Sequence, residues 1–469
     1  MTQIQLPPQW ETSPLSEIVE IIRGITYKKA QSATSPEEGL LPVLRANNIQ
    51  KGKIFTSELV YVPKDLIRIH QKLIAGDIVV AMSSGSKSVV GKTAYVKRGF
   101  DGSFGAFCGV LRTAPECSAN YVSWFTHSLD YRNRISSLSA GANINNLKPS
   151  HFDEIAVPIA PIAEQKAIVD KLDNLLAQVE NTKARLERIP QILKRFRQSV
   201  LAAAVSGRLT DDEEVGDESW SPTKLANLCT AAFDGPFGSK LKSSDYIDGG
   251  VGVVRLENIR HLRFDQSKET FISEDKYLAL IKNKLEKNDI LFSSFVDEEV
   301  RACLFPFEAS PFINKADCFC LRIDHKKALP EFVLYLLTSQ VSYAQIKEHV
   351  QGVTRPRVNL KILKSLEFPV PPLQVQAEVV RKVEQLLARA ERIEQQVNNA
   401  LKRVNNFTQS ILAKAFRGEL TEQWRKDNPE LVSGEKSAEA LLGRIKSERA
   451  KQEPAVRRTK SKKSEHSAT

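Results

Sequence analysis

The segment FRQSVLAAAVSGRLT, from Phe196 to Thr210, recurs near the other end of the chain as FTQSILAKAFRGELT, from Phe407 to Thr421. The similarity extends upstream, because residues 158–210 align without a gap with residues 369–421 at an offset of about 211. About a third of the aligned positions are identical. A gapless match of this length indicates an internal duplication, and a repeat decides more about the fold than any single motif does.

Both copies have the apolar periodicity of long helices. We expect helices over residues 162–206 and 373–417, within spacers 158–210 and 369–425, because prolines suit a helix start and Gly207 and Gly418 suit C-terminal caps. Pro190 should kink the first helix. The heptad positions predicted to form the seams are Ile168, Leu172, Leu175, Val179, Leu186, Ile189, Leu193 and Phe196 in the first copy, and Val379, Val383, Leu386, Ala390, Ile393, Val397, Ala400, Val404 and Phe407 in the second.

An apolar stripe is more often ordinary core than a partner site. Two equivalent seams in one chain can nevertheless bury each other, so the duplication favours an intramolecular antiparallel coiled coil that acts as a spacer.

The regions between the helical copies, residues 1–157 and 211–368, also correspond, although less closely. LPVLRANNI, from Leu41 to Ile49, resembles VGVVRLENI, from Val251 to Ile259, and Asn146-Leu-Lys148 resembles Asn359-Leu-Lys361. Short β-branched runs bounded by Gly, Asn and Asp indicate strands. We therefore predict an α+β fold with two related globules and a pseudo-two-fold internal repeat. Residues 426–469 lack apolar periodicity after Ile445, which predicts a mobile basic tail.

Composition limits the class of protein. The chain has 469 residues, a hydrophobic fraction of 42% and a mean hydropathy of −0.28, which are values of a protein that folds in water. No stretch approaches the roughly 18 unbroken apolar residues of a membrane span, and the start does not resemble a signal peptide, so we expect a cytoplasmic protein without a membrane partner. The six cysteines have no metal-site spacing and are expected to be reduced. The net charge of +11 favours a polyanionic partner.

The order globule, helix, globule, helix resembles the specificity subunits of type I restriction-modification systems, over essentially the whole chain. The stretches that look like the enterobacterial branch, type IA, are RANNIQ from Arg45, AMSSGSKSVVG from Ala81, FGAFCGVLR from Phe104 and SILAKAFRGEL from Ser410.

The resemblance implies a function and a set of partners. Each globule would be a target-recognition domain that reads one half of a bipartite, asymmetric site in double-stranded DNA. The helices would fix the gap between the halves and dock two methyltransferase subunits, and two restriction subunits with motor and nuclease activity would join for cleavage. S-adenosylmethionine, ATP and magnesium would then be bound by those partners, and this chain would hold no cofactor and would not be an enzyme.

Side chains able to read bases occur in several polar strips. Base reading favours Arg, Lys, Asn, Gln and small hydroxyl residues, whereas phosphate contacts require only positive charge or amide donors. An ordinary polar turn or an Asn cap is the competing interpretation at each strip. The predicted DNA-binding residues are Arg45, Asn48, Ser83, Ser84, Ser86, Lys87, Ser88, Lys92, Asn143, Asn145, Asn146 and Lys148 in the first globule, and Lys240, Arg255, Asn258, Arg260, Arg301, Arg355, Arg357, Asn359 and Lys361 in the second.

The repeat separates these residues into two groups. Residues shared by the globules, such as Arg45 with Arg255, Asn48 with Asn258 and Asp77 with Asp289, cannot easily distinguish two different half-sites. They should serve the fold or the phosphate backbone. Specificity should therefore depend on positions where the globules differ, for instance Lys87 in the first and Lys240, Arg260, Arg301 and Arg355 in the second.

Catalytic signatures are not evident in the sequence. The segment from Gly85 to Thr93 looks like a phosphate-binding loop, but five residues rather than four separate its glycines. Neither an Asn-Pro-Pro-Tyr-like tetrad nor a glycine-rich loop suited to a methyl donor is present, and the seven histidines are dispersed. The alternatives are a free-standing DNA-binding regulator, a cryptic nuclease or NTPase, and a coiled-coil organiser, which would leave two basic globules without a task.

Overall fold

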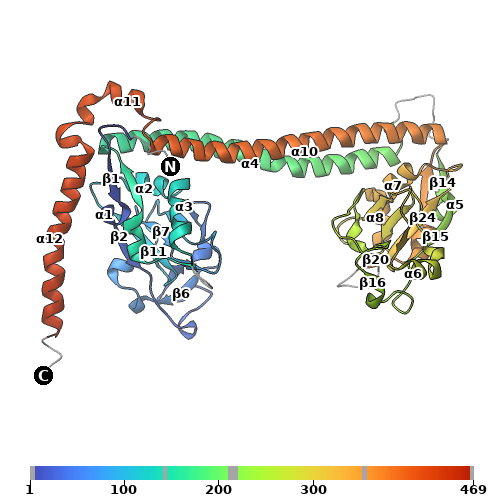
Figure 1. Cartoon of the computed structure of the whole chain (residues 1–469), viewed down its shortest axis with the longest axis horizontal. Coiled ribbons are helices and arrows are strands. Elements are labelled where there is room, and N and C mark those ends of the chain that lie inside the picture. The colour runs from blue at the N-terminus through green and yellow to red at the C-terminus, as the bar shows by residue number, and fades with distance from the viewer. Residues whose placement is uncertain (1–5, 141–144, 210–219, 351–355, 465–469) are drawn as a thin grey trace. The chain divides into compact units, whose positions relative to one another are not determined.

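The chain forms two compact units that share both long helices. The computed structural model describes residues 6–140, 145–209, 220–350 and 356–464, with side chains as far as residue 451. One unit comprises residues 1–185 and 400–469, and the other comprises residues 186–399. The division falls inside α4 (Ile162–Val205) and α10 (Leu373–Phe416), so each unit contains one globule and half of each helix (Figure 1). We call the globule of residues 11–159 the first head and that of residues 221–370 the second head.

The first head is built around a four-stranded antiparallel sheet with strand order β2-β11-β7-β9. A three-stranded sheet, β10-β3-β6, and the pairs β1–β13, β12–β8 and β4–β5 surround it. The elements are β1 (Glu11–Pro14), α1 (Leu15–Ile18), β2 (Val19–Arg23), β3 (Leu40–Leu44), β4 (Ile49–Gln50), β5 (Lys53–Ile54), β6 (Val60–Pro63), β7 (Ile78–Ala81), β8 (Ser83–Ser84), β9 (Thr93–Tyr95), β10 (Ser103–Phe104), β11 (Cys108–Thr113), α2 (Ala119–Phe125), α3 (Leu129–Leu138), β12 (Asn145–Asn146) and β13 (Ala156–Ile159).

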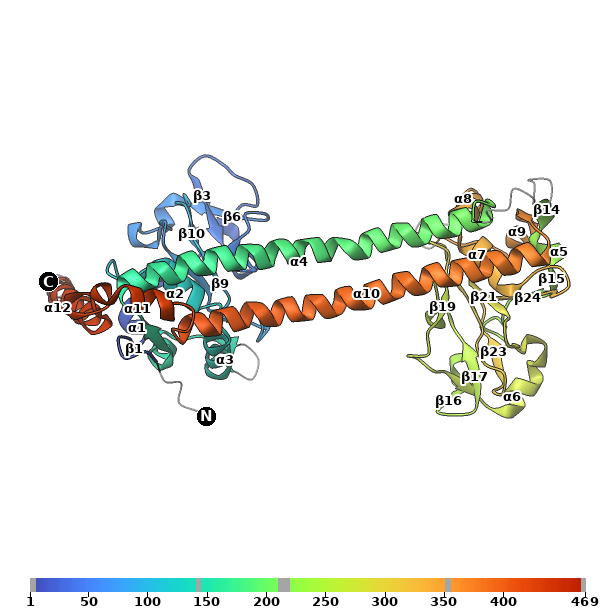
Figure 2. The same ribbon diagram turned by 90° about the horizontal axis from the view of Figure 1, so that it is seen from above.

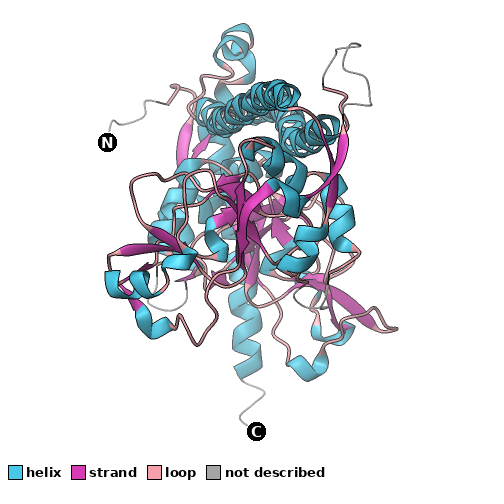
Figure 3. Cartoon of the chain, turned by 90° about the vertical axis from the view of Figure 1, so that its right-hand side faces the viewer, coloured by secondary structure: helices cyan, strands magenta, loops and turns pink. Residues whose placement is uncertain are grey.

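The second head repeats this plan with a central sheet of order β15-β24-β21-β22. A second sheet, β16-β20-β17-β23, and the pairs β14–β25 and β18–β19 complete it. Its elements are β14 (Ser221–Lys224), α5 (Leu225–Leu228), β15 (Cys229–Phe233), β16 (Tyr246–Ile247), β17 (Val251–Val254), β18 (Ile259–Arg260), β19 (Arg263–Phe264), β20 (Phe271–Ile272), α6 (Glu274–Ala279), β21 (Ile290–Ser293), β22 (Ala302–Leu304), β23 (Phe312–Asn314), β24 (Cys318–Ile323), α7 (Pro330–Thr338), α8 (Gln340–Lys347), α9 (Leu360–Ser365) and β25 (Glu367–Val370). Strands and helices are mixed in the globules, which confirms the α+β prediction (Figure 3).

In each unit the two long helices run antiparallel and side by side (Figure 2). The Lys171 ammonium donates to the carbonyl of Leu420 at 3.0 Å, and at the equivalent place in the repeat the Lys382 ammonium donates to the carbonyl of Leu209 at 2.8 Å. Both helices have the extents that the sequence predicts, and α4 continues without interruption across Pro190. The predicted antiparallel coiled coil is therefore confirmed, with the internal repeat visible in its polar contacts.

The heptad prediction is wrong for three seam positions. Ile168, Leu172, Val379 and Val383 are fully buried, whereas Ile393, Phe196 and Phe407 are 43%, 39% and 58% exposed. A straight helix drifts by about 20° per heptad relative to a strict seven-residue repeat, so a seam assigned at one end turns away from the partner at the other. Near their C-termini the helices bury Leu201 and Leu412, together with their neighbours, instead.

The helices share the cores of the heads. Ile168, Leu172 and Phe416 belong to the main apolar cluster of the first head, and Leu201 and Val379 belong to that of the second. One buried amide joins each head to its helix. Gln165 accepts from the Ser118 N–H at 2.9 Å and donates to the Ala160 carbonyl, and Gln376 accepts from the Leu329 N–H at 2.8 Å and donates to the Pro371 carbonyl.

The prediction of a mobile tail over residues 426–469 is wrong for its first half. Helices α11 (Glu422–Asp427) and α12 (Ala438–Ser464) follow α10, and Val432, Leu441 and Ile445 are buried, the last two in the core of the first head. The Arg449 guanidinium donates to the carbonyl of Ser16 at 2.5 Å. A few apolar side chains spaced three or four residues apart are sufficient to anchor this segment, although they do not form a long periodic stripe.

The remaining global features concern cysteines and membranes. All six cysteines are free thiols, five of them buried. Across residues 6–140, 145–209, 220–350 and 356–464, no helix is both long and apolar enough to cross a bilayer.

Candidate nucleic-acid interface

Two polar strips of the first head, separated in sequence, form one surface. Strand β8 pairs with β12, so Ser83 lies opposite Asn146 and Ser84 opposite Asn145. The Asn145 amide also donates to the Gly85 carbonyl at 3.4 Å. Within the serine loop the hydroxyls of Ser86 and Ser88 lie 2.9 Å apart. The structure therefore brings together most of the residues predicted for this head, with Lys87, Lys92 and Lys148 exposed; Asn143 lies outside the described residues.

Phe107 belongs to the same surface but was not among the predicted residues. Its carbonyl accepts from the N–H groups of Met82 at 2.8 Å and Ser83 at 3.2 Å, and its ring is 69% exposed. Phe107 lies between Gly105 and Gly109 in FGAFCGVLR, and sequence patterns assign an apolar side chain of this kind to the core. Its position in a turn between β10 and β11 was the available signal.

The corresponding surface of the second head centres on Arg357. Arg357 pairs with Phe295 in an isolated antiparallel bridge, and its guanidinium lies 4.4 Å from the centroid of the Phe295 ring. The Arg357 Nη2 atom is 3.6 Å from a carboxylate oxygen of Asp317. The ring contact and the ion pair together restrict the guanidinium while leaving the side chain 49% exposed.

One neighbour of Arg357, Asn359, has a role different from the predicted contact with DNA. The Asn359 side chain accepts from the Ile362 N–H at 2.8 Å and caps α9, so the competing interpretation of Asn as a helix cap holds there. Lys361 is exposed in the first turn of α9, and Arg355 lies outside the described residues.

The repeat register differs from the sequence alignment at this point. The sequence comparison matches Asn146 with Asn359, whereas the structure matches Asn146 with Arg357 and Lys148 with Asn359. The Leu147 N–H donates to the Met82 carbonyl, as the Val358 N–H donates to the Ser294 carbonyl, which fixes the offset at 211. The Asn-Leu-Lys pattern therefore recurs two residues out of register, because hydrogen-bond register and not residue identity defines the equivalent positions.

The shared asparagines are structural. The Asn48 side chain accepts from the Arg45 N–H at 2.9 Å and donates to the carbonyls of Phe55 and Ser57. Asn258 forms the same three bonds, with the N–H of Arg255 and the carbonyls of Asp265 and Lys268. Both amides are buried, so their side chains are not placed to contact DNA. This corrects the inclusion of Asn48 and Asn258 among the predicted DNA-binding residues and agrees with the structural role expected of residues that the two globules share.

The paired arginines Arg45 and Arg255 are partly engaged within the protein. The Arg45 guanidinium donates to the Glu58 carbonyl at 2.8 Å. Arg255 lies 3.4 Å from a Glu257 carboxylate oxygen and 5.8 Å from the centroid of the Tyr246 ring. Both side chains are half-buried, so they are less available to DNA than Arg357 is.

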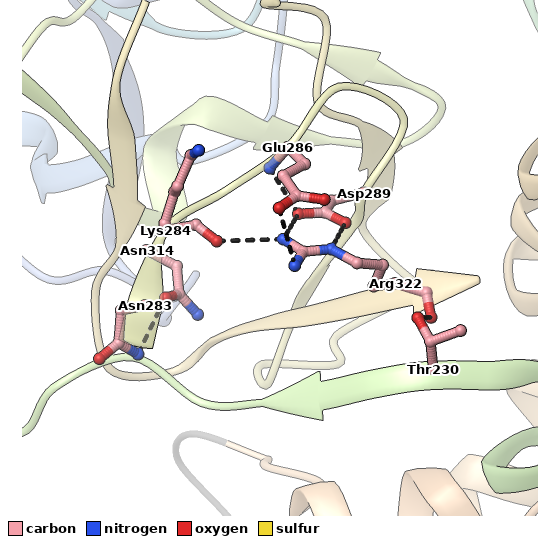
Figure 4. A network of polar contacts seen from close by, with 7 residues as sticks. All are labelled: Thr230, Asn283, Lys284, Glu286, Asp289, Asn314 and Arg322. Carbon is pink, nitrogen blue, oxygen red and sulfur yellow. Dashed lines mark hydrogen bonds and ion pairs between the residues drawn. The ribbon is translucent and has the colours of Figure 1, made fainter. Parts of the chain in front are cut away.

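A buried ion pair also recurs in the two heads. Arg112 binds the fully buried Asp77 through two hydrogen bonds of 2.8 Å, and Arg322 binds Asp289 through two bonds of 2.9 and 2.8 Å (Figure 4). These hydrogen bonds raise the pKa of Arg112 and of Arg322, so both guanidinium groups stay charged. The pair fixes the turn before β7 and before β21, because each carboxylate also accepts from a turn N–H, that of Ile74 or Glu286.

The other predicted cations of the second head lie in separate loops. Lys240 is exposed in a turn after β15, Arg260 in β18 forms an ion pair of 3.1 Å with Asp265, and Arg301 is half-buried beside β22. In the part of the chain that the structure describes, no group of three or more His, Cys, Asp or Glu side chains could hold a metal ion.

Comparison with known proteins places the chain in a family. The family model described as "Type I restriction modification DNA specificity domain" matches twice, over residues 7–191 and 218–403. The specificity subunit of the type I restriction enzyme StySPI from Salmonella potsdam is 47% identical over 469 residues, which cover 96% of this chain and 97% of that protein. That of EcoKI from Escherichia coli strain K12 is 47% identical over 457 residues, with coverage of 96% and 97%.

A solved structure has the same fold. It comes from work on the complex assembly and conformational transition of the type I R-M system, and it superposes with a TM-score of 0.68 at 17% identity, over 88% of this chain and 99% of its own. Together, the duplicated heads, the paired helices and these matches show that the chain is a DNA-specificity subunit rather than a catalytic one, and that it belongs to the family of type I restriction-modification specificity subunits, in the enterobacterial type IA branch.

Proposed function

We propose that this chain recognises a bipartite, asymmetric site in double-stranded DNA, with one half-site read by each head. The observation that carries the proposal is that one chain holds two heads with the same backbone plan and different exposed side chains at the candidate interface. Two readers of the same construction but different chemistry suit two different short sequences. The net charge of +11 supplies the sequence-independent attraction to the phosphate backbone.

The paired helices are proposed to hold the two half-sites at a constant separation. A helix of 44 residues has an axial length of about 66 Å at about 1.5 Å per residue, which exceeds one turn of DNA, about 34 Å. Fixed spacing between half-sites is the usual consequence of a rigid connection between two DNA-binding heads.

Two methyltransferase subunits are the proposed partners of the helices, and two restriction subunits would join this assembly. The helices present equivalent apolar side chains, Phe196 in one unit and Phe407 in the other, and both are exposed. Phe407 lines an apolar groove with Leu175, Val179 and Val404. Exposed aromatic side chains rimmed by polar ones are typical of protein interfaces, and two equivalent positions suit two copies of one partner.

The catalytic chemistry is assigned to those partners. S-adenosylmethionine would be bound by the methyltransferase subunits, and ATP and magnesium by the restriction subunits, so the isolated chain should neither methylate DNA nor hydrolyse ATP. We also propose a cytoplasmic location, because the proposed function acts on DNA. The matches to restriction-enzyme subunits do not favour the free-standing regulator.

The proposal is tested by single-molecule mapping of N6-methyladenine in cells that express this chain with its methyltransferase subunit. We expect a split motif with two different short halves at one fixed gap. A contiguous motif, or no motif, would overturn the proposal of two half-sites.

Docking is tested by exchanging the two exposed phenylalanines for serine, singly and together. Each single variant, Phe196→Ser or Phe407→Ser, should reduce the methyltransferase subunits that copurify with the chain from two to one, and the double variant should retain none. Val341→Ser, which changes an exposed apolar side chain of the second head, is the control. Two bound subunits in the double variant would exclude these side chains as the docking contacts.

A further inference from the structure

Both heads contain the same backbone arrangement at the candidate interface. In the first head the Met82 N–H donates to the Phe107 carbonyl, and the Leu147 N–H donates to the Met82 carbonyl, both at 2.8 Å. In the second head the Ser294 N–H donates to the Asp317 carbonyl, and the Val358 N–H donates to the Ser294 carbonyl, both at 2.9 Å. We call this arrangement the backbone frame. It joins the end of a central strand (β7 or β21), the turn before its neighbour in the sheet (β11 or β24) and the segment that leads into the last strand of the head.

The two heads carry different side chains at three equivalent positions of the backbone frame. These pairs are Ser83 and Phe295, Phe107 and Asp317, and Asn146 and Arg357. All six side chains are exposed or half-buried, and Phe107 is 69% exposed. The contrast is with the residues that the heads share, Asn48 with Asn258 and Asp77 with Asp289, which are buried and hydrogen-bonded. Constant backbone with variable exposed side chains is the arrangement expected of a surface that discriminates between ligands of one class.

We infer that these three positions are the main determinants of base specificity, and that Arg357 reads a guanine in the half-site of the second head. This inference rests on the proposed function, in which each head reads one half-site. Arginine recognises guanine by donating two hydrogen bonds to the O6 and N7 atoms. A guanidinium held by a ring at 4.4 Å and a carboxylate at 3.6 Å loses less conformational freedom when it binds a base edge than an unrestrained one does. Phe295 and Asp317 are thus positioning residues for Arg357.

The first head has different chemistry on the same frame. Asn146 replaces the guanidinium with an amide, which suits the N6 and N7 atoms of adenine, and Phe107 replaces the carboxylate with a ring, which suits the methyl group of thymine. The first head is therefore expected to read an A·T pair at the place where the second reads guanine. The residues that differ elsewhere, such as Lys240 and Arg260, would contact phosphates.

The test compares substitutions on and off the frame in the complete complex with methyltransferase. Arg357→Ala should relax the second half-site at one guanine, with a loss of discrimination of about five- to 150-fold, and leave the first half-site unchanged. Asn146→Ala should relax one position of the first half-site only. The matched control is Lys287→Ala, which removes an exposed, ion-paired cation of the second head and should leave both half-sites intact.

Methylome mapping gives the motif, and competition binding with duplexes changed at single bases gives the discrimination ratio of a variant that methylates weakly. If Arg357→Ala weakens every sequence alike, or changes no base preference, the inference is wrong. If the unsubstituted chain shows no split motif, the proposed function fails instead, so the two failures are distinguishable.

The positioning residues have a separate readout. Phe295→Leu should lower discrimination at the guanine that Arg357 is proposed to read, without a change in affinity for non-specific DNA. Phe295→Tyr, which retains the ring, should keep the discrimination of the unsubstituted chain. Equal loss in both variants would show that Phe295 only maintains the fold.

Discussion

The two heads have nearly the same architecture but different attachments to the rest of the chain. Trp10 and Trp220 occupy equivalent positions, each immediately before the first strand of a head. The Trp10 indole donates to the carboxylate of Glu164 at 2.9 Å, whereas the position equivalent to Glu164 in the second copy is Val375, which packs in the apolar cluster. The start of the long helix can therefore be packed against its head either by polar contacts, as in the first copy, or by apolar contacts, as in the second.

The polar network is present where a third segment must be held. Glu164 is fully buried, accepts from the Thr421 hydroxyl at 2.6 Å and forms an ion pair with Arg425, so it connects the start of α4 with the segment after α10. Arg425 also donates to the Gly418 carbonyl at 2.8 Å. The first head therefore depends on the segment after α10 for its stability. The ion pair between Glu164 and Arg425 provides much of this contact.

The largest loss of stability is expected when Glu164 of the first copy is replaced by valine, the residue at the equivalent position of the second copy. Glu164→Val should destabilise the first unit by about 3–5 kcal/mol, because it leaves the Arg425 guanidinium, whose side chain is only 10% exposed, without its partner. Thermal unfolding measures the loss. The double variant Glu164→Val with Arg425→Met should recover most of it, since removing both charges avoids the unpaired cation. Equal instability of the single and double variants would contradict this explanation.

A somewhat smaller and equal effect is expected at the ion pair that the heads share. Asp77→Ala and Asp289→Ala should each cost about 3 kcal/mol, at the low end for a buried pair because both arginines are partly exposed. Urea unfolding of the whole chain measures both. Lys287→Ala, at an exposed pair, should change stability by less than about 0.5 kcal/mol. A large difference between the two heads would indicate that the pair does not have the same structural role in each.

The smallest effect concerns pH and should appear in the second head alone. Burial raises the pKa of Asp234 from its ordinary value of 3.8 to about 6, and Asp317 adds to the rise, whereas Arg23 stands at the equivalent position of the first head. Because the folded state binds this proton more tightly than the unfolded chain, the contribution of Asp234 to stability is largest below about pH 4. It is lost as the pH rises to about 6.

The measurement is urea unfolding at pH 4.5 and 6.5 for the unsubstituted chain and for Asp234→Asn. In the variant, the difference in unfolding free energy between the two pH values should lack the contribution of Asp234. The contributions of the other titratable groups should be unchanged. Identical pH profiles for the two proteins would show that Asp234 does not titrate in this range.

The sequence predicted the two helices, the α+β heads and the repeat because duplication leaves identities at a constant offset. It did not predict the burial of Val432, Leu441 and Ile445, because three or four apolar side chains in a charged segment are not distinguishable from a solvated helix until their partner surface is known. The exposure of Phe407 was missed for a related reason, since periodicity shows that a helix has an apolar face but not where its partner ends.

The interface was predicted in part. The serine and asparagine strips were identified by their donors, and the structure shows that they pair as β8 and β12. The sequence offered two pairings for Asn146: the Asn-Leu-Lys match gives Asn359, whereas the offset of 211 seen in the helical repeat gives Arg357. The hydrogen bonds of Leu147 and Val358 decide for Arg357. Positions that determine specificity are expected to diverge, so sequence similarity between the heads is weakest where it would be most informative.

If the two heads read DNA independently and share one backbone frame, they should be interchangeable. The most direct test is to replace residues 221–370 with a second copy of residues 11–159. The joins lie at the first and last strands of each head, which are β1 and β13 in one and β14 and β25 in the other. Methylated adenines would then be mapped in cells that also express the methyltransferase subunit. The account predicts a split motif at the original gap in which both halves carry the sequence of the first half-site. A folded chimera that still required the original second half-site would contradict it.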